Sequence, residues 1–379
     1  MERRRIVAMD REGRGRVLVT LVRAEGSSYR RTGARMLVGA DASYAGTISG
    51  GCLEAEVVRK AVWMTRGGAV VERYSTMFDD TAEIPYGLGC GGVLDLLLEP
   101  AGTAEYDALL RAVERSLGGE EAVVSTWLPQ RGRPLMRAVF SVGGEPVDGE
   151  FADGKFAQGE LRFASQGLTR GQIAAVDGVS LMAGEDAFVE RIGSPQRLFV
   201  IGAGDDARPV VSMAAMLGWS VTVADGRGQL ARPERFPEAE RVAVVGSASE
   251  LGVRGRDAVV VMTHSYEQDR EALTAMLALE VSPVYLGLLG SRHRSSLLVS
   301  EAAAMLGRSV GECCDRIYAP MGLDLGGDGA GAIALAVVAE VHARVEGRLG
   351  ASRRLSAEDV AENVERGGAS RYLQTQCAL

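Results

Sequence analysis

The amino-acid sequence predicts an α/β protein in which an N-terminal α+β domain precedes a C-terminal Rossmann-like domain with a doubly wound parallel sheet. Its length of 379 residues is typical of two domains. After residue 196, short apolar segments alternate with helical segments, which is the pattern of βαβ units in a parallel sheet. We therefore expect domains at residues 1–142 and 196–349, an irregular β-rich linker region at 143–195, and a polar C-terminal tail at 350–379.

In the first half, the spacing of apolar residues defines each element in turn. Residues 2–13 are mostly charged and are expected to form a short helix, whereas residues 17–22 are apolar and largely β-branched, as in a strand. Apolar residues at helical spacing predict helices at 53–65 and 103–117. Further strands are expected at residues 36–38, 70–77, 93–98, 123–128 and 137–142.

The second half begins with a buried strand at residues 197–201 and a glycine-rich turn that opens a helix at 205–217. Pro209 is compatible with this helix because proline is tolerated in a first turn. The alternation continues with strands at 220–224, 241–245, 258–262 and 284–286, and with helices at 267–279, 291–307 and 331–345.

Composition disfavours several classes of protein. The formal net charge of −8 disfavours a broad electrostatic contact with nucleic acid or an anionic membrane, so we expect neither as a partner. The longest apolar stretches, such as residues 332–338, are too short to span a bilayer, and no apolar signal-peptide core follows the basic start of the chain. The five cysteines fit no disulfide or zinc-site spacing, which predicts a reducing cytoplasm.

A cysteine framed by glycines, in the segment Ser49-Gly50-Gly51-Cys52-Leu53-Glu54, is the central candidate site of the first half. It lies at the start of a predicted helix, whose N-terminus offers free N–H groups and the positive end of the dipole. Both features lower the pKa of a thiol and attract anions, and the glycines let a ligand approach the backbone. The alternative is that Cys52 is a small core residue, the usual fate of a free cysteine.

A second cysteine, Cys90, also lies between glycines. It joins Cys52 in one site if the two loops meet.

The turn at Gly202 and Gly204 belongs to a GxGxxA fingerprint that follows a predicted strand and opens a helix. Asp225 ends the next strand, where an acidic residue accepts a ribose hydroxyl in dinucleotide-binding folds. Two carboxylates at the helix start, Asp205 and Asp206, count against this interpretation because they compete with a phosphate for the helix dipole. The alternative is a Rossmann-like fold that binds no nucleotide.

Two further segments follow strands of the predicted parallel sheet. His264 comes directly after strand 258–262, where the carboxyl ends of strands line the ligand crevice, and is a candidate acid, base or ligand contact. Its alternative role is a hydrogen bond within the loop. Gly290, Ser291 and Arg292 combine a glycine turn, a helix N-cap and a cation, which is typical of an anion cradle or simply of a well-capped helix.

Taken in this order, these segments resemble the XdhC/CoxI family over nearly the whole chain. The resemblance rests on Gly26-Ser27-Ser28, Gly33-Ala34-Arg35-Met36, the Gly50-Gly51-Cys52 and Gly89-Cys90-Gly91 segments, Gly202-Ala203-Gly204, Thr263-His264, Gly287-Leu288-Leu289-Gly290-Ser291 and Pro320-Met321-Gly322-Leu323-Asp324-Leu325-Gly326.

The sequence departs from the family pattern at two places. Asp205 stands where members often carry His, which puts a ligand contact at that position in doubt. Tyr29-Arg30-Arg31 stands where a proline-containing segment is common, which is a variation in a loop.

The resemblance implies a maturation factor for molybdenum hydroxylases. Such proteins bind the molybdenum cofactor, protect it while a cysteine desulfurase supplies the terminal sulfur, and help to insert it into an apo-enzyme such as a xanthine dehydrogenase or CO dehydrogenase. They turn over no substrate themselves. The resemblance also implies that Cys52 holds the cofactor, and a thiolate suits molybdenum. The cofactor is a pterin phosphate that in bacteria often carries a nucleotide, which suits a Rossmann-like crevice.

Two other functions fit parts of the sequence. An NAD(P)-dependent oxidoreductase fits the Gly202 fingerprint, with His264 as its acid and Cys52 incidental. A non-catalytic scaffold between desulfurase and hydroxylase fits a nucleotide fold that has lost its ligand. A homodimer is expected because it is the commonest assembly of soluble oligomers.

Overall fold

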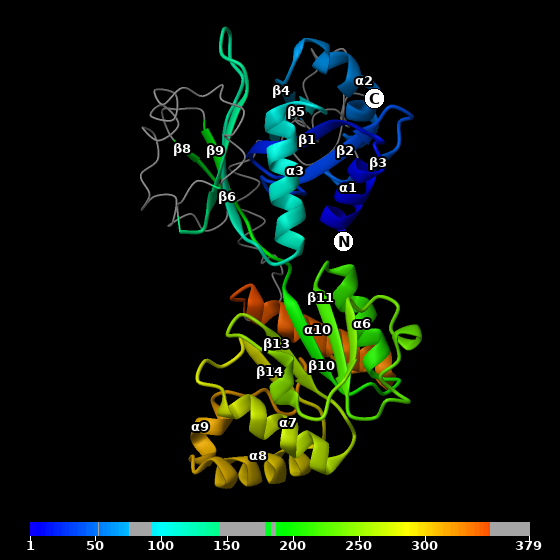
Figure 1. The fold of residues 1–379 in the computed structure, drawn as a ribbon, viewed down its shortest axis with the longest axis vertical. Coiled ribbons are helices and arrows are strands. Elements are labelled where there is room, and N and C mark those ends of the chain that lie inside the picture. The colour runs from blue at the N-terminus through cyan, green and yellow to red at the C-terminus, as the bar shows by residue number, and fades with distance from the viewer. Residues whose placement is uncertain (52, 76–91, 144–146, 148–178, 183–186, 349–379) are drawn as a thin grey trace, which may run out of the picture. The chain divides into compact units, whose positions relative to one another are not determined.

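The computed structural model describes residues 1–51, 53–75, 92–143, 147, 179–182 and 187–348, and the chain divides into two compact units. The first unit comprises residues 1–196 with 216–219, and the second comprises residues 197–215 with 220–379. Each unit has its own sheets, shown in Figure 1, and its own hydrophobic core.

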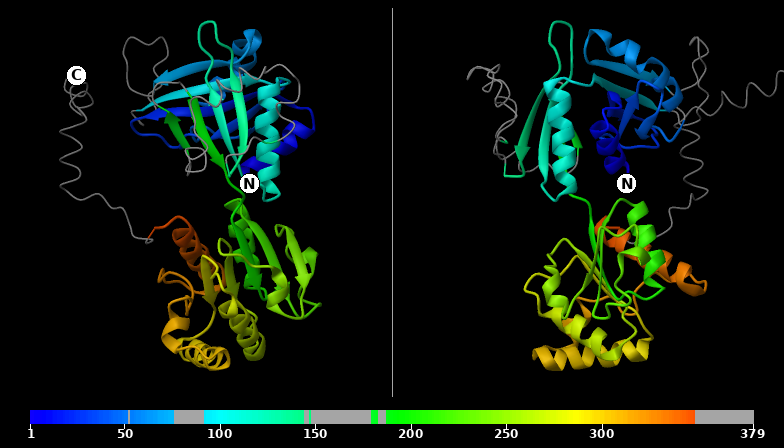
Figure 2. Two further views of the ribbon diagram at one scale, coloured as in Figure 1. Left: turned by 60° about the vertical axis from the view of Figure 1, so that its left-hand side comes forward. Right: turned by 45° about the vertical axis from the view of Figure 1, so that its right-hand side comes forward.

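The first unit is built on an antiparallel five-stranded sheet with the strand order β3-β2-β1-β5-β4. The central strands β1 and β5 are the longest of this sheet and pair with each other over most of their length. Figure 2 shows the same ribbon from two further sides. The strands are β1 (Gly15–Glu25), β2 (Arg35–Gly39), β3 (Tyr44–Gly46), β4 (Val70–Ser75) and β5 (Val93–Pro100).

Helices cover both faces of this sheet because its strands are apolar on both sides. Val17 and Val19 of β1 pack under α2 (Glu54–Met64), which a short 3-10 turn at Thr65–Gly67 extends. Leu18 points to the opposite face, as the alternation of a strand requires, and packs under α1 (Glu2–Arg11) and α3 (Ala104–Leu117).

A second antiparallel sheet, in the order β7-β6-β9-β8, packs against the other side of α3. Two buried ion pairs link this sheet to the first: Arg137 of β7 with Glu99 of β5, and Arg35 of β2 with Glu190 of β9. Part of the region expected as a linker thus forms strands of this sheet. The strands are β6 (Ala122–Trp127), β7 (Met136–Ser141), β8 (Val179–Met182) and β9 (Ala187–Ile192).

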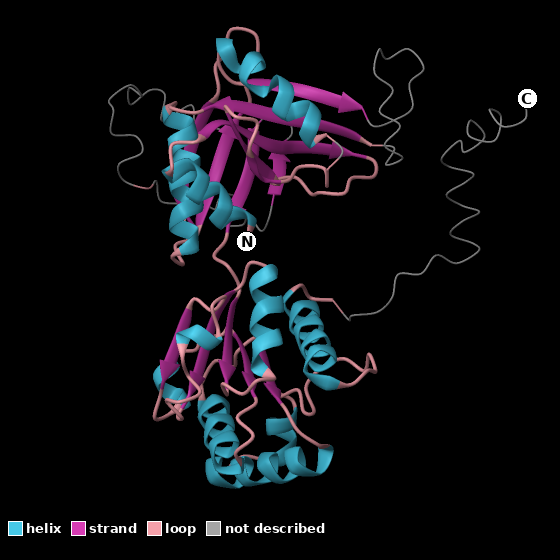
Figure 3. Cartoon of the chain, turned by 90° about the vertical axis from the view of Figure 1, so that its right-hand side faces the viewer, coloured by secondary structure: helices cyan, strands magenta, loops and turns pink. Residues whose placement is uncertain are grey.

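The second unit is a parallel five-stranded sheet with the order β12-β11-β10-β13-β14, flanked by helices in Figure 3. The chain starts at the central strand β10, moves outward to one edge, and then returns to build the other half. The sheet therefore has a topological switch point between β10 and β13. The strands are β10 (Arg197–Ile201), β11 (Ser220–Asp225), β12 (Arg241–Val244), β13 (Ala258–Val261) and β14 (Tyr285–Leu288).

The two halves of the parallel sheet place their helices on opposite faces, because right-handed crossovers on either side of the switch point lead to opposite sides. One face carries a core of alternate strand residues, such as Phe199 and Val259, packed against α7 and α8. The helices are α6 (Ala207–Met216), α7 (Tyr266–Ala278), α8 (Arg292–Leu306), α9 (Val310–Cys314) and α10 (Gly329–Val345), with 3-10 turns at Pro233–Arg235 and Ala248–Leu251.

The predicted fold class is confirmed: a mixed α/β N-terminal domain precedes a Rossmann-type domain with a parallel five-stranded sheet. The short strand β3 and the short helix α9 were not expected from the sequence, because three and five residues give too little periodicity to recognise. In the part of the chain that the structure describes, no helix is long and apolar enough to cross a membrane.

Position 202, at the carboxyl end of β10, must be glycine because the end of β13 lies very close to it. Its φ is +124°, and a Cβ at this position would lie 2.4 Å from the carbonyl oxygen of Met262. We expect Gly202→Ala to lower the free energy of unfolding of the second unit by about 3 kcal/mol, measured by chemical denaturation.

Gly228→Ala is the matched control, since a Cβ at Gly228 would meet nothing closer than 3.7 Å. Equal stability of the two variants would show that the backbone at Gly202 relaxes at little cost.

Candidate functional site

The loop before α2 is held by the side chain of the helix's own first residue, Glu54. Its two carboxylate oxygens accept hydrogen bonds at 2.8–3.1 Å from the backbone N–H groups of four consecutive residues, Ile48, Ser49, Gly50 and Gly51. The hydroxyl of Ser49 also donates to Glu54, at 2.6 Å, and accepts a hydrogen bond from the N–H of Leu53 at 2.9 Å. The carboxylate therefore fixes the backbone on both sides of position 52.

Glu54 is 1% exposed, so the cost of burying its charge must be met by hydrogen bonds. Desolvation raises the pKa of the carboxyl, but the hydrogen bonds from Ser49 and the loop N–H groups outweigh it and lower the pKa to about 2. The N–H groups of residues 48–51 are therefore not free for an external anion. An internal carboxylate already occupies them.

One short loop, residues 26–29, contacts the described ends of both glycine-framed segments. The ring of Tyr29 packs on Gly50, where a Cβ would lie 2.6 Å from the ring, and the carbonyl of Ser27 lies against Gly92. Both glycines are thus required by close packing against this loop. Cys52 and Cys90 themselves lie outside the described residues.

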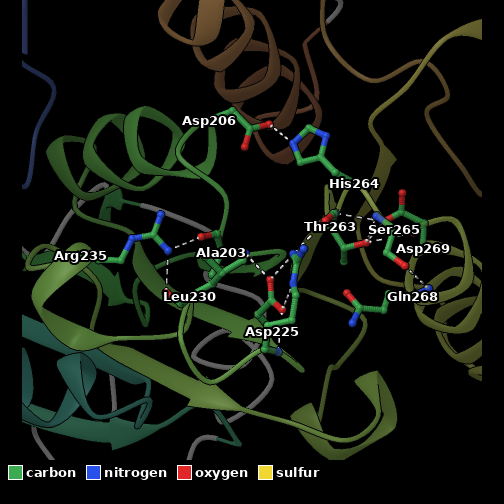
Figure 4. A network of polar contacts seen from close by, with 11 residues as sticks. Ala203, Asp206, Asp225, Leu230, Arg235, Thr263, His264, Ser265, Gln268 and Asp269 are labelled. Carbon is green, nitrogen blue, oxygen red and sulfur yellow. Dashed lines mark hydrogen bonds and ion pairs between the residues drawn. The ribbon is translucent and has the colours of Figure 1, made fainter.

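In the second unit, the predicted residues Gly202, Gly204, Asp225 and His264 lie together at the carboxyl ends of β10, β11 and β13. Figure 4 shows Asp225 and His264 with their polar contacts. A Cβ at Gly204 would lie 3.5 Å from His264 Cδ2. In open α/β sheets, ligands bind at this edge, beside the topological switch point.

The carboxylate of Asp225 is buried and fully engaged with neighbouring donors. It accepts hydrogen bonds from the backbone N–H groups of Ala203 and Arg227, each at 2.8 Å, and from the Arg227 guanidinium at 2.8 and 2.9 Å. Desolvation opposes ionisation, but these contacts dominate and lower the pKa of Asp225. Because a carboxylate has about four lone-pair positions, a ribose hydroxyl can bind Asp225 only if Arg227 moves.

Arg227 also links the ends of β11 and β13, the two strands that lie on either side of β10. Its guanidinium donates to the carbonyl of Thr263 at 2.8 Å, beyond the end of β13, while holding Asp225 at the end of β11. A second arginine, Arg235, donates to the carbonyl of Ala203 at 2.7 Å and pairs with Asp205 at 2.9 Å.

His264 pairs with Asp206 at the start of α6, with 2.7 Å between Nε2 and Oδ2. Its φ of +62° is uncommon for a residue other than glycine and places the ring toward the turn at Gly204. The side chain is 57% exposed. The hydrogen bond fits both the loop-contact role and the acid–base role that the sequence left open.

The segment that begins at Gly290 reaches this edge of the sheet through Arg294, a residue that the sequence analysis did not single out. Ser291 is the N-cap of α8, as predicted, and accepts a hydrogen bond from the N–H of Arg294. The Arg294 guanidinium lies 2.7 Å from buried Asp269, which in turn accepts hydrogen bonds from the N–H and hydroxyl of Thr263. Arg292 instead lines a separate cavity of about 220 Å³.

The sequence analysis named the glycines of both turns and one carboxylate beside each, Glu54 and Asp225. It did not name most of the side chains that contact the second turn and the neighbouring strand ends. Arg227 could have been found, because it lies two residues beyond Asp225 and carries the complementary charge. Asp269 and Arg294 gave no such signal, since only the fold brings them together. Among the described residues, no group of three or more His, Cys, Asp or Glu side chains could hold a metal ion.

Two family models match this chain. The model described as the XdhC and CoxI family matches residues 9–75, which include the Glu54 loop, and the model described as the XdhC Rossmann domain matches residues 198–341. The chain belongs to the XdhC and CoxI family.

Two curated relatives and one solved structure support the family membership. A probable xanthine dehydrogenase subunit of Bacillus subtilis (strain 168) is 29% identical over 329 residues, covering 86% of this chain and 92% of that protein. The molybdenum cofactor insertion chaperone PaoD of Escherichia coli (strain K12) is 29% identical over 333 residues, covering 87% of this chain and 83% of that protein. A crystal structure described as a xanthine dehydrogenase from Bacillus halodurans superposes with a TM-score of 0.72 at 25% identity, covering 95% of this chain and 99% of that one.

Replacing Glu54 tests the role of its carboxylate in this member of the XdhC and CoxI family. Its pKa of about 2, against a usual 4.5, means that the ionised carboxylate stabilises the fold above pH 4.5 and that this contribution is lost as the pH falls toward 2. We expect Glu54→Gln to lower the free energy of unfolding by about 3 kcal/mol at neutral pH, measured by urea denaturation.

The difference between wild type and Glu54→Gln should shrink as the pH is lowered through that interval. Glu105→Gln, in the first turn of α3, is the matched control and should have little effect. A pH-independent difference would contradict the assigned role of the charge.

Replacing Arg227 tests the ion pair that it makes with Asp225 at this edge of the parallel sheet. Arg227→Ala removes the bidentate partner of a carboxylate whose side chain is fully buried, and we expect it to destabilise the second unit by about 3 kcal/mol. Thermal or chemical denaturation measures the change. Arg232→Ala, on the same connection but 64% exposed, should be nearly neutral, and equal effects of the two variants would refute the importance of the pair.

Proposed function

We propose that this chain is a molybdenum cofactor chaperone: it holds the cofactor as cargo, protects it while the terminal sulfur is added, and helps to insert it into a xanthine dehydrogenase or CO dehydrogenase-type hydroxylase. The observation that carries the proposal is the match to a relative named as a molybdenum cofactor insertion chaperone, which extends over both units of the chain.

The geometry of the first unit supports this proposal. Glu54 fixes the backbone on both sides of position 52, so the loop is prepared before any cargo binds. Binding is stronger when the receiving groups are already held in place. On this proposal Cys52 supplies a thiolate to the molybdenum or its sulfur, and Gly50, Gly51, Glu54 and Cys90 shape the same site.

The proposal names partners and a setting for this chaperone. A cysteine desulfurase supplies the sulfur, and an apo-hydroxylase receives the cofactor, in its plain or its dinucleotide form. A homodimer in a reducing cytoplasm agrees with the common assembly of soluble proteins and with the cysteine content.

The oxidoreductase alternative draws on the second unit. Its Rossmann topology and the gathering of Gly202, Gly204, Asp225 and His264 favour a nucleotide site, to which Gly290, Ser291 and Arg292 would add an anion contact. The carboxylate of Asp225 already accepts hydrogen bonds from Arg227, which argues against tight dinucleotide binding at this position. We therefore rank NAD(P) binding, and catalysis that depends on it, below the chaperone function.

Replacing Cys52 tests the proposed function. The protein is purified from cells that make the molybdenum cofactor, and bound pterin and molybdenum are quantified by fluorescence after oxidation and by mass spectrometry. We expect Cys52→Ala to retain at least about tenfold less of both than wild type, because its metal-directed thiolate is lost.

Cys314→Ala is the matched control, because Cys314 is an exposed free cysteine of the second unit, and it should retain as much cofactor as wild type. Absence of pterin from the wild type, together with tight binding of NADH, would replace the chaperone proposal with the oxidoreductase one.

A further inference from the structure

A cavity of about 410 Å³ in the first unit lies beside the Glu54 loop and is rich in arginine. It is bounded by the start of α1, by the loop before β2 and by β2 itself, and it lies entirely within the first unit. Six of its lining residues carry the argument: Glu2, Arg3, Tyr29, Arg30, Arg31 and Arg35.

The positive charge of this cavity exceeds what the surrounding carboxylates neutralise. Arg30 pairs with Glu2 at 2.5 Å, and Arg35 pairs with Glu190. In the described part of the chain, neither Arg3 nor Arg31 has a carboxylate within ion-pairing distance; Arg3 donates only to the carbonyl of Gly193, at 2.6 Å. The cavity therefore has two guanidinium groups in excess.

A buried donor in the same cavity wall is also unsatisfied. Arg35 is 9% exposed, and its Nε has no hydrogen-bond partner among the residues that the structure describes. Buried polar groups are normally hydrogen-bonded, because a buried donor without a partner is costly. Because this atom has almost no exposed surface, an acceptor in the cavity would reach it only if the Arg35 side chain moved.

Tyr29 connects this cavity to the proposed cargo site. Tyr29 is 75% exposed and lines the cavity, and its ring also packs on Gly50 of the loop that Glu54 holds. An extended ligand at that loop would pass Tyr29 to reach the arginines.

We infer that this cavity binds the phosphate or diphosphate ester of the cargo, which rests on the proposed chaperone function. Guanidinium groups bind phosphate oxygens through paired, charge-assisted hydrogen bonds, and the surplus of two positive charges matches a doubly charged anion. The N–H groups of residues 48–51 cannot take this part because Glu54 occupies them. The volume lies within the range of small-molecule sites.

The test substitutes Arg31, which is exposed, lines the cavity and has no side-chain partner among the described residues. Wild type, Arg31→Glu, Arg31→Lys and the control Arg66→Ala are compared by calorimetric titration with inorganic pyrophosphate at low salt. Arg66 is exposed in the same unit, beyond the end of α2. Pterin content is measured on the same preparations.

We expect Arg31→Glu to bind pyrophosphate at least about tenfold more weakly and to carry less pterin, since it replaces an attraction by a repulsion. Arg31→Lys should keep most of the affinity because it keeps the charge, and Arg66→Ala should match wild type. Added salt should weaken binding to wild type.

The outcomes separate the two proposals. Equal pyrophosphate affinity of Arg31→Glu and wild type overturns the anion site whatever the pterin content. Unchanged pterin on Arg31→Glu, when wild type carries it, overturns the assignment of the cargo's phosphate to this cavity while the chaperone function stands. A wild type that binds pyrophosphate through Arg31 but carries no pterin overturns the chaperone function alone.

Discussion

The buried carboxylate of Glu54 is the interaction on which the first unit's candidate site depends. A negative charge at the N-terminus of α2 is stabilised by the helix dipole and by four loop N–H groups together. The loop and the helix consequently hold each other: without the carboxylate, the N–H groups lack acceptors, and without the loop, the charge is buried unpaired. Position 52 is thus carried on a backbone whose shape does not depend on a ligand.

The second unit repeats this arrangement at a different glycine turn. Asp225 accepts the N–H of Ala203 inside the Gly-Ala-Gly turn and is itself neutralised by Arg227. In both units a motif that is typical of anion binding has an internal carboxylate bound to its N–H groups. The two differ in one respect, since Arg227 is partly exposed and can be displaced, whereas the donors to Glu54 are backbone groups fixed in the loop.

The sequence predicted the fold well because strand and helix periodicity is local. The strand at residues 197–201 and the helix N-cap at Ser291 were located correctly from neighbouring residues alone. The site was predicted less completely because its contacts are not local. No periodicity shows that Arg35 meets Glu190, which is 155 positions away, or that Arg294 rather than Arg292 turns toward Asp269. A motif also does not reveal whether its N–H groups are already satisfied, as those of Gly50 and Gly51 are by Glu54.

The backbone N–H groups of residues 48–51 already donate to Glu54, and this limits how the first unit can hold an anionic cargo. If a phosphate displaced Glu54 from the loop, a buried carboxylate would lose five donors, a cost that one ligand contact does not offset. The positive charge must then come from side chains, and the arginines beside Tyr29 are the ones that lie next to this loop. Exposed guanidinium groups bind phosphate with modest, salt-sensitive strength. Such a contact suits a carrier that must also release its cargo, whereas a fully buried ion pair such as Arg137 with Glu99 is screened much less by solvent and salt.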